Sequence, residues 1–233
     1  MTDTDRDTTP ATTSRAPLTK ARVLEAAVAL ADRDGIEALS MRRLGQELGV
    51  EGMALYRHVR DKEAILDGIV DLVFAEMELP QEDEEAWEHQ VTRRAHAMRG
   101  GLRRHPWAIG LLESRSSPGP ATLRHQDETI RILREAGFSI EMTAHASALL
   151  DSFVCGFALQ EAARPFRVTS TGPKTTRRGS APLDPEAYPH LAEMAQEHLL
   201  RPGYDFGDEF TLGLDLILTA LAGSARAGDL TPP

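Results

Sequence analysis

Residues 34–67 read DGIEALSMRRLGQELGVEGMALYRHVRDKEAILD, and this stretch decides the fold. Ser40 is a good N-cap for a short helix over residues 41–48, and Gly49 suits the left-handed position that ends such a helix. A second short helix is predicted over residues 51–59 from its inward-facing apolar pair four residues apart. Two short helices joined by a Gly-Val turn are typical of a helix-turn-helix.

Helices are predicted on both sides of this pair. Apolar residues recur at helical spacing over residues 23–31, and Gly35 ends that helix. Asp61 can cap a further helix over residues 62–77, whose apolar stripe runs for more than three turns and suits a connector. Residues 17–78 are therefore expected to form a three-helix helix-turn-helix domain with its connecting helix.

The rest of the chain predicts more helices and almost no strand. Residues 79–225 are expected to form a larger helical domain, with one long helix from residue 140 to 164 and a final apolar helix near 206–223. Thr, Pro, Gly and Arg dominate residues 167–189, which predicts a flexible loop, and the polar residues 1–16 predict a disordered arm. The expected fold class is all-α.

The charge of the chain is divided by region. A formal net charge of -10 argues against a nucleic-acid partner when it is taken over all 233 residues. Residues 14–62, however, hold 9 Lys and Arg against 7 Asp and Glu, so they carry +2 and the remainder carries -12. The helix-turn-helix can therefore approach phosphate although the whole chain is acidic.

The sequence lacks the signals that are usual for membrane, secreted and zinc- or disulfide-stabilised proteins. No window approaches the roughly 20 consecutive apolar residues of a membrane span, and the Thr- and Asp-rich start does not resemble a signal peptide, so a cytoplasmic protein without a membrane partner is expected. The single cysteine, Cys155, has no partner for a disulfide within the chain or a structural zinc site, and it is expected to be buried.

Enzymatic signals are missing as well. We find no nucleophile elbow, phosphate loop, Rossmann fingerprint or metal-spaced His and Cys cluster, and the eight histidines are scattered. Neither catalytic nor metal-binding residues nor a cofactor are therefore expected. An enzyme and a structural interaction protein stay open as alternatives, but the second leaves the basic edge of the helix-turn-helix unexplained.

The quoted stretch closely resembles the DNA-binding domain of the TetR family of repressors, over residues 18–77 without a gap. Similarity to the tetracycline-repressor branch extends through residues 134–161, REAGFSIEMTAHASALLDSFVCGFALQE, and through residues 206–223, FGDEFTLGLDLILTALAG. The resemblance implies that the second domain binds a ligand and forms a dimer. It also implies a regulator that a small molecule releases from a palindromic operator, although an activator of the same fold stays open.

The resemblance also implies which residues contact DNA: Arg42, Gly52, Met53, Ala54, Tyr56, Arg57, His58 and Lys62. Arg42 would read a guanine edge, and the three residues that begin the recognition helix would meet bases through thymine methyl groups. Tyr56, His58 and Lys62 would contact phosphates. A solvated surface arginine, a half-buried packing ring for Tyr56 and a hydrogen bond within the domain for His58 stay open.

A dimer is expected because a surplus of two charges could not hold DNA at physiological salt, whereas a two-fold dimer doubles the contacts and reads a palindrome. The long helix and the final helix would pack against their mates as a four-helix interface, as the family does. Small residues four apart on the long helix permit close approach. The predicted interface residues are Ala144, Ala148, Ser152, Gly156, Leu214 and Leu218.

The family binds its inducer in the C-terminal domain, and the mostly apolar lining of pockets suggests candidates for contact with it. They are Trp107, Leu111, Leu112, Phe138, His145 and Phe157, each of which is equally suited to ordinary core packing. A buried carboxylate needs a partner or a raised pKa. Asp151 and Asp215, within apolar helices, are therefore expected to orient a ligand or to cross-link helices.

The inducer itself is not predicted. The tetracycline repressor holds its drug through magnesium with a histidine and a carboxylate, and these fall near Glu113 or Ser114 and on Gln160 in this chain. Both expected groups are missing, although Glu161 lies next to the second position. Metal-chelated tetracycline is therefore not expected.

Overall fold

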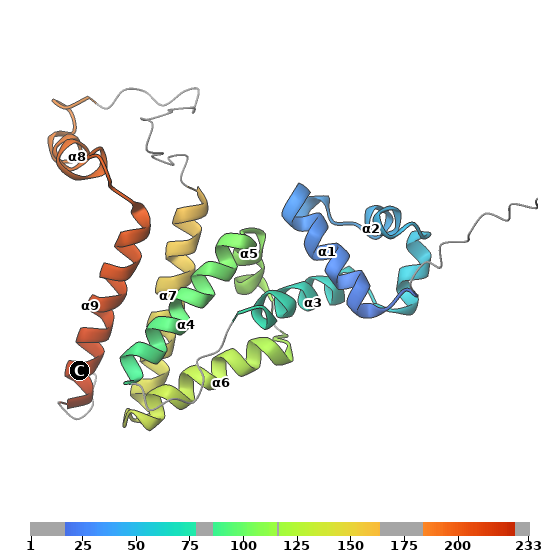
Figure 1. Ribbon diagram of the computed structural model, residues 1–233, viewed down its shortest axis with the longest axis horizontal. Helices are drawn as coiled ribbons and strands as arrows, with labels where there is room; N and C mark the ends of the chain where they lie inside the picture. Colours follow the sequence, from blue (N-terminus) through green and yellow to red (C-terminus); the bar gives the residue numbers. More distant parts are fainter. Residues whose placement is uncertain (1–16, 78–85, 116, 164–183, 227–233) are drawn as a thin grey trace, which may run out of the picture.

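The computed structural model describes residues 17–77, 86–115, 117–163 and 184–226, and every regular element within them is helical (Figure 1). The predicted all-α class is therefore confirmed. In chain order the elements are α1 (Lys20–Asp34), η1 (Ile36–Ala38), α2 (Met41–Leu48), η2 (Gly52–Arg57), α3 (Lys62–Ala75), α4 (Trp87–Arg104), α5 (Trp107–Ser114), α6 (Pro120–Glu135), α7 (Ile140–Ala163), α8 (Pro189–Met194), η3 (Ala195–Leu199) and α9 (Phe206–Arg226).

The helix ends follow the predicted capping residues. The Ser40 side chain accepts a hydrogen bond from the Arg43 amide at 3.2 Å, and Asp61 accepts one from the Ala64 amide at 2.8 Å. Gly49 ends α2 in the left-handed conformation with φ 63°. The recognition element η2 differs from the expected α-helix, since its six residues form a 3-10 helix, the tighter form that proteins use in short pieces.

Two hydrophobic clusters divide the described chain, and α3 belongs to both. We call α1, η1, α2 and η2 the head, and α4 to α9 the body. The first half of α3 packs into the head through Ile65, Leu66 and Ile69, and its second half packs into the body through Val70, Val73 and Phe74. The predicted connecting helix is thus a shared core element rather than an exposed linker.

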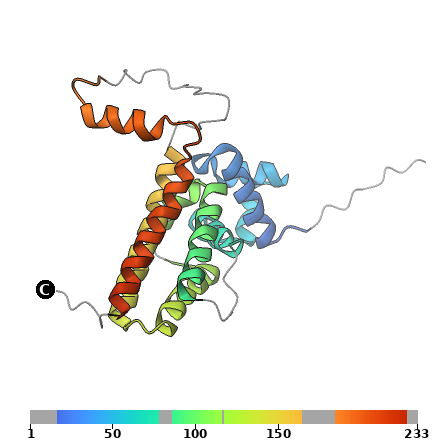
Figure 2. The same ribbon diagram turned by 60° about the vertical axis from the view of Figure 1, so that its left-hand side comes forward.

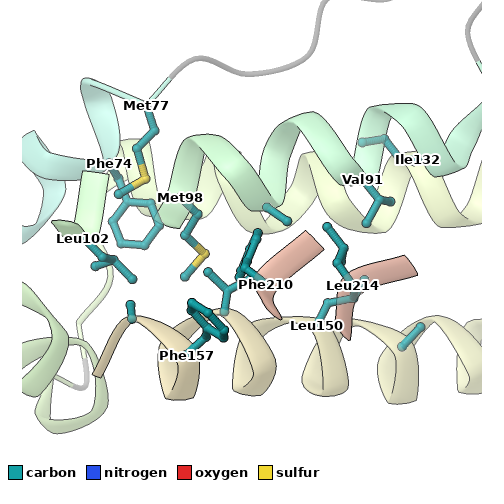
Figure 3. Close-up of a cluster of buried hydrophobic side chains, with 14 of the residues drawn as sticks. Phe74, Met77, Val91, Met98, Leu102, Ile132, Leu150, Phe157, Phe210 and Leu214 are labelled. Atoms are coloured by element: carbon teal, nitrogen blue, oxygen red, sulfur yellow. The ribbon is translucent and has the colours of Figure 1, made fainter. Parts of the chain in front are cut away.

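The core of the body lies between α4, α7 and α9. Figure 3 shows Met98 from α4, Leu150 and Phe157 from α7, and Phe210 and Leu214 from α9 pointing toward one another. All five side chains are at most 7% exposed. Figure 2 shows α7 and α9 running side by side along one edge of the body.

The long helix α7 is long and apolar enough to meet the length and composition criteria of a membrane span. In the structure it packs against α4, α6 and α9, and the buried residues on its inner side include Ala146, Leu150 and Val154. It is therefore a core helix of the bundle.

Two predicted mobile segments fall largely outside the described residues. The predicted arm, residues 1–16, and residues 167–183 of the predicted loop 167–189 are not described. From residue 184 the chain forms a turn that leads into α8 at Pro189. The sequence pattern did not predict α8 or the π-helical turn η3 that follows it.

Candidate DNA-contacting surface and ligand cavity

The two helices of the helix-turn-helix are held together by backbone contact at two glycines. A Cβ atom on Gly45 would lie 2.8 Å from the Val50 carbonyl oxygen, and one on Gly52 would lie 3.1 Å from the Met41 carbonyl oxygen. These distances leave no room for a side chain at Gly45 and little at Gly52. Gly52, a predicted base contact, therefore has a packing role between α2 and η2.

Three cations of the head and the start of α3 have no ion-pair partner among the described residues. Arg42, Arg57 and Lys62 are exposed, and none of them forms an ion pair with any described residue. The neighbouring Arg43, in contrast, forms an ion pair with Asp34 at 2.7 Å. The unpaired cations can therefore bind phosphate or a base edge without first breaking an ion pair.

The remaining predicted DNA contacts lie on η2 or directly after it. Met53 is 76% exposed and Tyr56 is 47% exposed, whereas Ala54 and His58 are half-buried. Neither the Tyr56 hydroxyl nor the His58 ring forms a hydrogen bond to a described residue. Both polar groups are therefore available to an external acceptor or donor.

A cavity of about 440 Å³ lies in the body against the connecting helix. That volume is within the usual range for small-molecule sites, roughly 300–1,000 Å³. Its lining comes from α3, α4, α5, α6, α7 and the segment before α6: Asp67, Val70, Phe74, Arg94, Met98, Leu112, Arg115, Ser117, Pro118, Gly119, Thr122, Gln126, Asp151, Ser152 and Cys155.

Leu112 alone among the predicted ligand-contacting residues lines this cavity. Phe138 is 1% exposed and packs edge-on against Trp87, with 5.1 Å between the ring centroids. Phe157 stacks on Phe206 with 4.5 Å between ring centroids. Both phenylalanines therefore pack in the body core, the alternative that the sequence left open, because helical periodicity cannot separate a core face from a cavity face.

Three further predicted ligand contacts also lie elsewhere. His145 points away from the body, with a side chain that is 66% exposed. Trp107 and Leu111 pack between the head cluster and the body cluster. His145 is thus a surface residue, and Trp107 and Leu111 belong to the junction between head and body.

That junction also contains a polar cluster. The Trp107 indole donates to Asp32 of α1 at 2.6 Å, and His105 Nδ1 lies 2.8 Å from the same carboxylate oxygen. The other ring nitrogen of His105 lies 3.2 Å from Glu76, just beyond the end of α3. The loop between α4 and α5 thereby ties α1 of the head to the end of the connecting helix.

The charged residues that line the cavity all form ion pairs. Arg94 contacts Asp151 at 3.3 Å, so this carboxylate both cross-links helices and lines the cavity. Arg115 pairs with Asp67 at 2.6 Å and with Glu63, both on α3. Sequence reasoning missed Arg94 and Arg115, because their partners lie 57 and about 50 residues away along the chain.

The predicted dimer residues divide between surface and core. Ala144, Ala148 and Ser152 are exposed on α7, and a Cβ atom on Gly156 would meet nothing within 4 Å. Leu214 and Leu218 are 0% and 5% exposed within the single chain and pack in the body core. The exposed leucines of α7 are Leu149 at 47% and Leu159 at 56%, and those of α9 are Leu212 at 57% and Leu216 at 64%.

Metal ligands do not gather in the part of the chain that is described, where no group of three or more His, Cys, Asp or Glu side chains could hold an ion. Gln160, at one position of the missing magnesium site, is exposed on α7.

A helix-turn-helix with exposed cations that no described residue pairs, joined by one helix to a helical body with a cavity, defines a DNA-binding transcriptional regulator. Residues 23–69 match the model for bacterial regulatory proteins of the tetR family, and residues 79–223 match the tetracyclin repressor-like C-terminal domain. The chain belongs to the TetR family.

Individual relatives are similar over most of their length. The HTH-type transcriptional repressor DrrR1 of Streptomyces coeruleorubidus is 32% identical over 219 residues, which cover 89% of this chain and 80% of the relative. The class A tetracycline repressor from transposon 1721 in Escherichia coli is 29% identical, with 86% and 88% covered. The crystal structure of apo ActR from Streptomyces coelicolor superimposes with a TM-score of 0.73 at 28% identity and covers 91% of this chain and 98% of ActR.

Proposed function

We propose that this protein is a homodimeric repressor that binds a palindromic operator and leaves it when a small molecule fills the body cavity. The observation that carries this proposal is the position of α3, which links the head to the cavity wall through Asp67 and Val70. A regulator that binds operator DNA acts in the cytoplasm, where the chromosome is accessible.

The exposed leucines of α7 and α9 support the dimer. Large exposed apolar side chains on two adjacent helices favour burial against a partner. A second copy of the same chain would meet Leu212 and Leu216 with an equivalent surface, as a two-fold interface requires. Dimerisation would also place two heads on one face of a DNA duplex.

The relatives support both operator DNA and a small molecule as ligands of the proposed repressor. DrrR1 is named a transcriptional repressor, and ActR has been crystallised in complex with actinorhodin at a TM-score of 0.72 and 29% identity to this chain. We therefore assign the cavity of this chain to a small-molecule inducer, without transferring the identity of the relatives' ligands.

The first test is selection of binding sites from a pool of random-sequence DNA duplexes, followed by titration of the best duplex at several salt concentrations. We expect a palindromic consensus, binding by one dimer, and an affinity that falls steeply with salt. Arg42→Ala should relax the preference for one base in each half-site. Failure to enrich any sequence, or enrichment of a non-repeated site bound by a monomer, would contradict the proposal.

A further inference from the structure

The two cations that line the cavity are each buried more deeply than the carboxylates with which they pair. The Arg94 side chain is 4% exposed, whereas that of Asp151 is 40% exposed. The Arg115 side chain is 18% exposed, whereas those of Glu63 and Asp67 are 61% and 28% exposed. The lining therefore holds two guanidinium groups and two carboxylates, and the guanidinium group is the more deeply buried member of each pair.

Both guanidinium groups also have donors to spare. Each carries five N–H groups. Arg94 uses three of them, to Asp151 and to the His125 carbonyl, at 3.3–3.4 Å, which is long beside the usual 2.7–2.9 Å of a charge-assisted bond. Arg115 uses three as well, to Asp67 and to the side chain and carbonyl of Glu63. A ligand oxyanion in the cavity would therefore find unused donors at Arg115, whereas Arg94 offers little accessible surface.

Arg115 and Thr122, which line the cavity, also bind one face of the connecting helix α3. Glu63, Asp67 and Asp71 follow one another at four-residue spacing on α3 and so lie on one side of it. Arg115 binds the first two, and Thr122 binds the third through its amide at 2.9 Å and its hydroxyl at 3.1 Å. Arg115 is the cation that touches both the cavity and the end of α3 nearest the head.

We propose that the cavity binds an amphipathic anion, an apolar ring system with one acidic group, and that this group draws Arg115 away from Glu63 and Asp67 and so releases α3. This inference rests on the proposed function and gives it a ligand class and a trigger. The ring system would lie on the apolar part of the lining, which consists of Val70, Phe74, Met98, Leu112 and Pro118.

The inference can be tested with two fluorescent probes that share one skeleton. 8-Anilinonaphthalene-1-sulfonate carries an acidic group, and N-phenyl-1-naphthylamine is the same ring system without it. We expect the sulfonate to bind the full-length protein about tenfold more tightly than the neutral probe, and to lower the affinity for the selected operator duplex. The tenfold ratio corresponds to about 1.4 kcal/mol, close to the contribution of one hydrogen bond to a charged group.

Variants of the ion pairs separate a ligand contact from a purely structural residue. Arg115→Gln should weaken sulfonate binding about tenfold, leave binding of the neutral probe within about twofold, and abolish the effect of the sulfonate on operator binding. Glu63→Gln should strengthen sulfonate binding, because Glu63 competes for Arg115 yet does not line the cavity. Arg131→Gln is the matched control, since Arg131 also binds two carboxylates but lies outside the cavity lining.

The outcomes distinguish the inference from the function on which it rests. If the wild-type protein selects no operator, the proposed function fails. If it binds the operator but binds both probes equally well, or binds neither, the anionic ligand class is wrong. If the sulfonate releases the operator from Arg115→Gln as it does from the wild type, the role of Arg115 is wrong and the repressor stands.

Discussion

At the scale of single residues, the turn between α2 and η2 depends on the absence of one side chain. Gly45→Ala would place a methyl group 2.8 Å from the Val50 carbonyl and 2.9 Å from the Gly52 amide nitrogen. Because both neighbours are backbone, we expect a loss of about 1–3 kcal/mol in the free energy of unfolding, measured by chemical denaturation. Gly100→Ala in α4 is the control, since a methyl group there meets nothing within 4 Å, and it should stabilise the protein by about 0.5–1 kcal/mol.

A second residue-scale prediction concerns cations with and without partners. Lys62→Ala removes an exposed ammonium group that forms no ion pair with a described residue, so the dependence of log affinity on log salt should become shallower by about 1. Arg33→Ala removes an arginine that already binds Glu47 at 2.9 Å and should leave the slope unchanged. Equal slopes for the wild type and Lys62→Ala would remove Lys62 from the phosphate-contacting set.

At the scale of elements, α9 presents different leucines to its own chain and to solvent. Leu216→Glu places a charge on a side chain that is 64% exposed, so it should convert the dimer to a monomer in sedimentation while the helical content is kept. Leu214→Ala empties a fully buried position and should instead cost about 2–5 kcal/mol of stability. A dimer that persists in Leu216→Glu would place the interface on another surface.

Element-scale features also show what the sequence could predict. Ser40, Gly49 and Asp61 act through neighbours three or four residues away, so local patterns predicted these helix ends correctly. The sequence could not separate burial of Leu214 and Leu218 within the chain from burial against a second subunit, because one apolar stripe suits either. The cavity escaped prediction since its polar groups meet only through tertiary folding.

At the scale of the whole molecule, stability should depend on pH through a buried histidine. Burial lowers the pKa of His125, which is 4% exposed and hydrogen bonds to the Phe74 carbonyl at 2.9 Å. A folded-state pKa below the ordinary value of 6.5 means that stability is fully present above that pH and is lost as the pH falls below it. His125 therefore favours the folded state at neutral pH and opposes it in mild acid.

Thermal unfolding at pH 7.5 and at pH 5.5 measures this effect. We expect His125→Gln to show a smaller fall in melting temperature between the two conditions than the wild type, because glutamine can donate to the Phe74 carbonyl without titrating. His190→Gln, at a side chain that is 97% exposed, should behave as the wild type does. An identical pH dependence in all three proteins would assign the acid sensitivity to other groups.

The sharing of α3 between two hydrophobic clusters limits how new specificities can be assembled. The change of cluster falls between Ile69 and Val70, in the middle of a continuous helix. A chimaera that takes its DNA-reading part from another regulator must therefore be joined within this helix and in phase. One inserted residue would rotate everything beyond it by about 100°, and Asp71 would no longer face Thr122. Exchange of parts between such regulators is then a problem of helical phase, not of linker length.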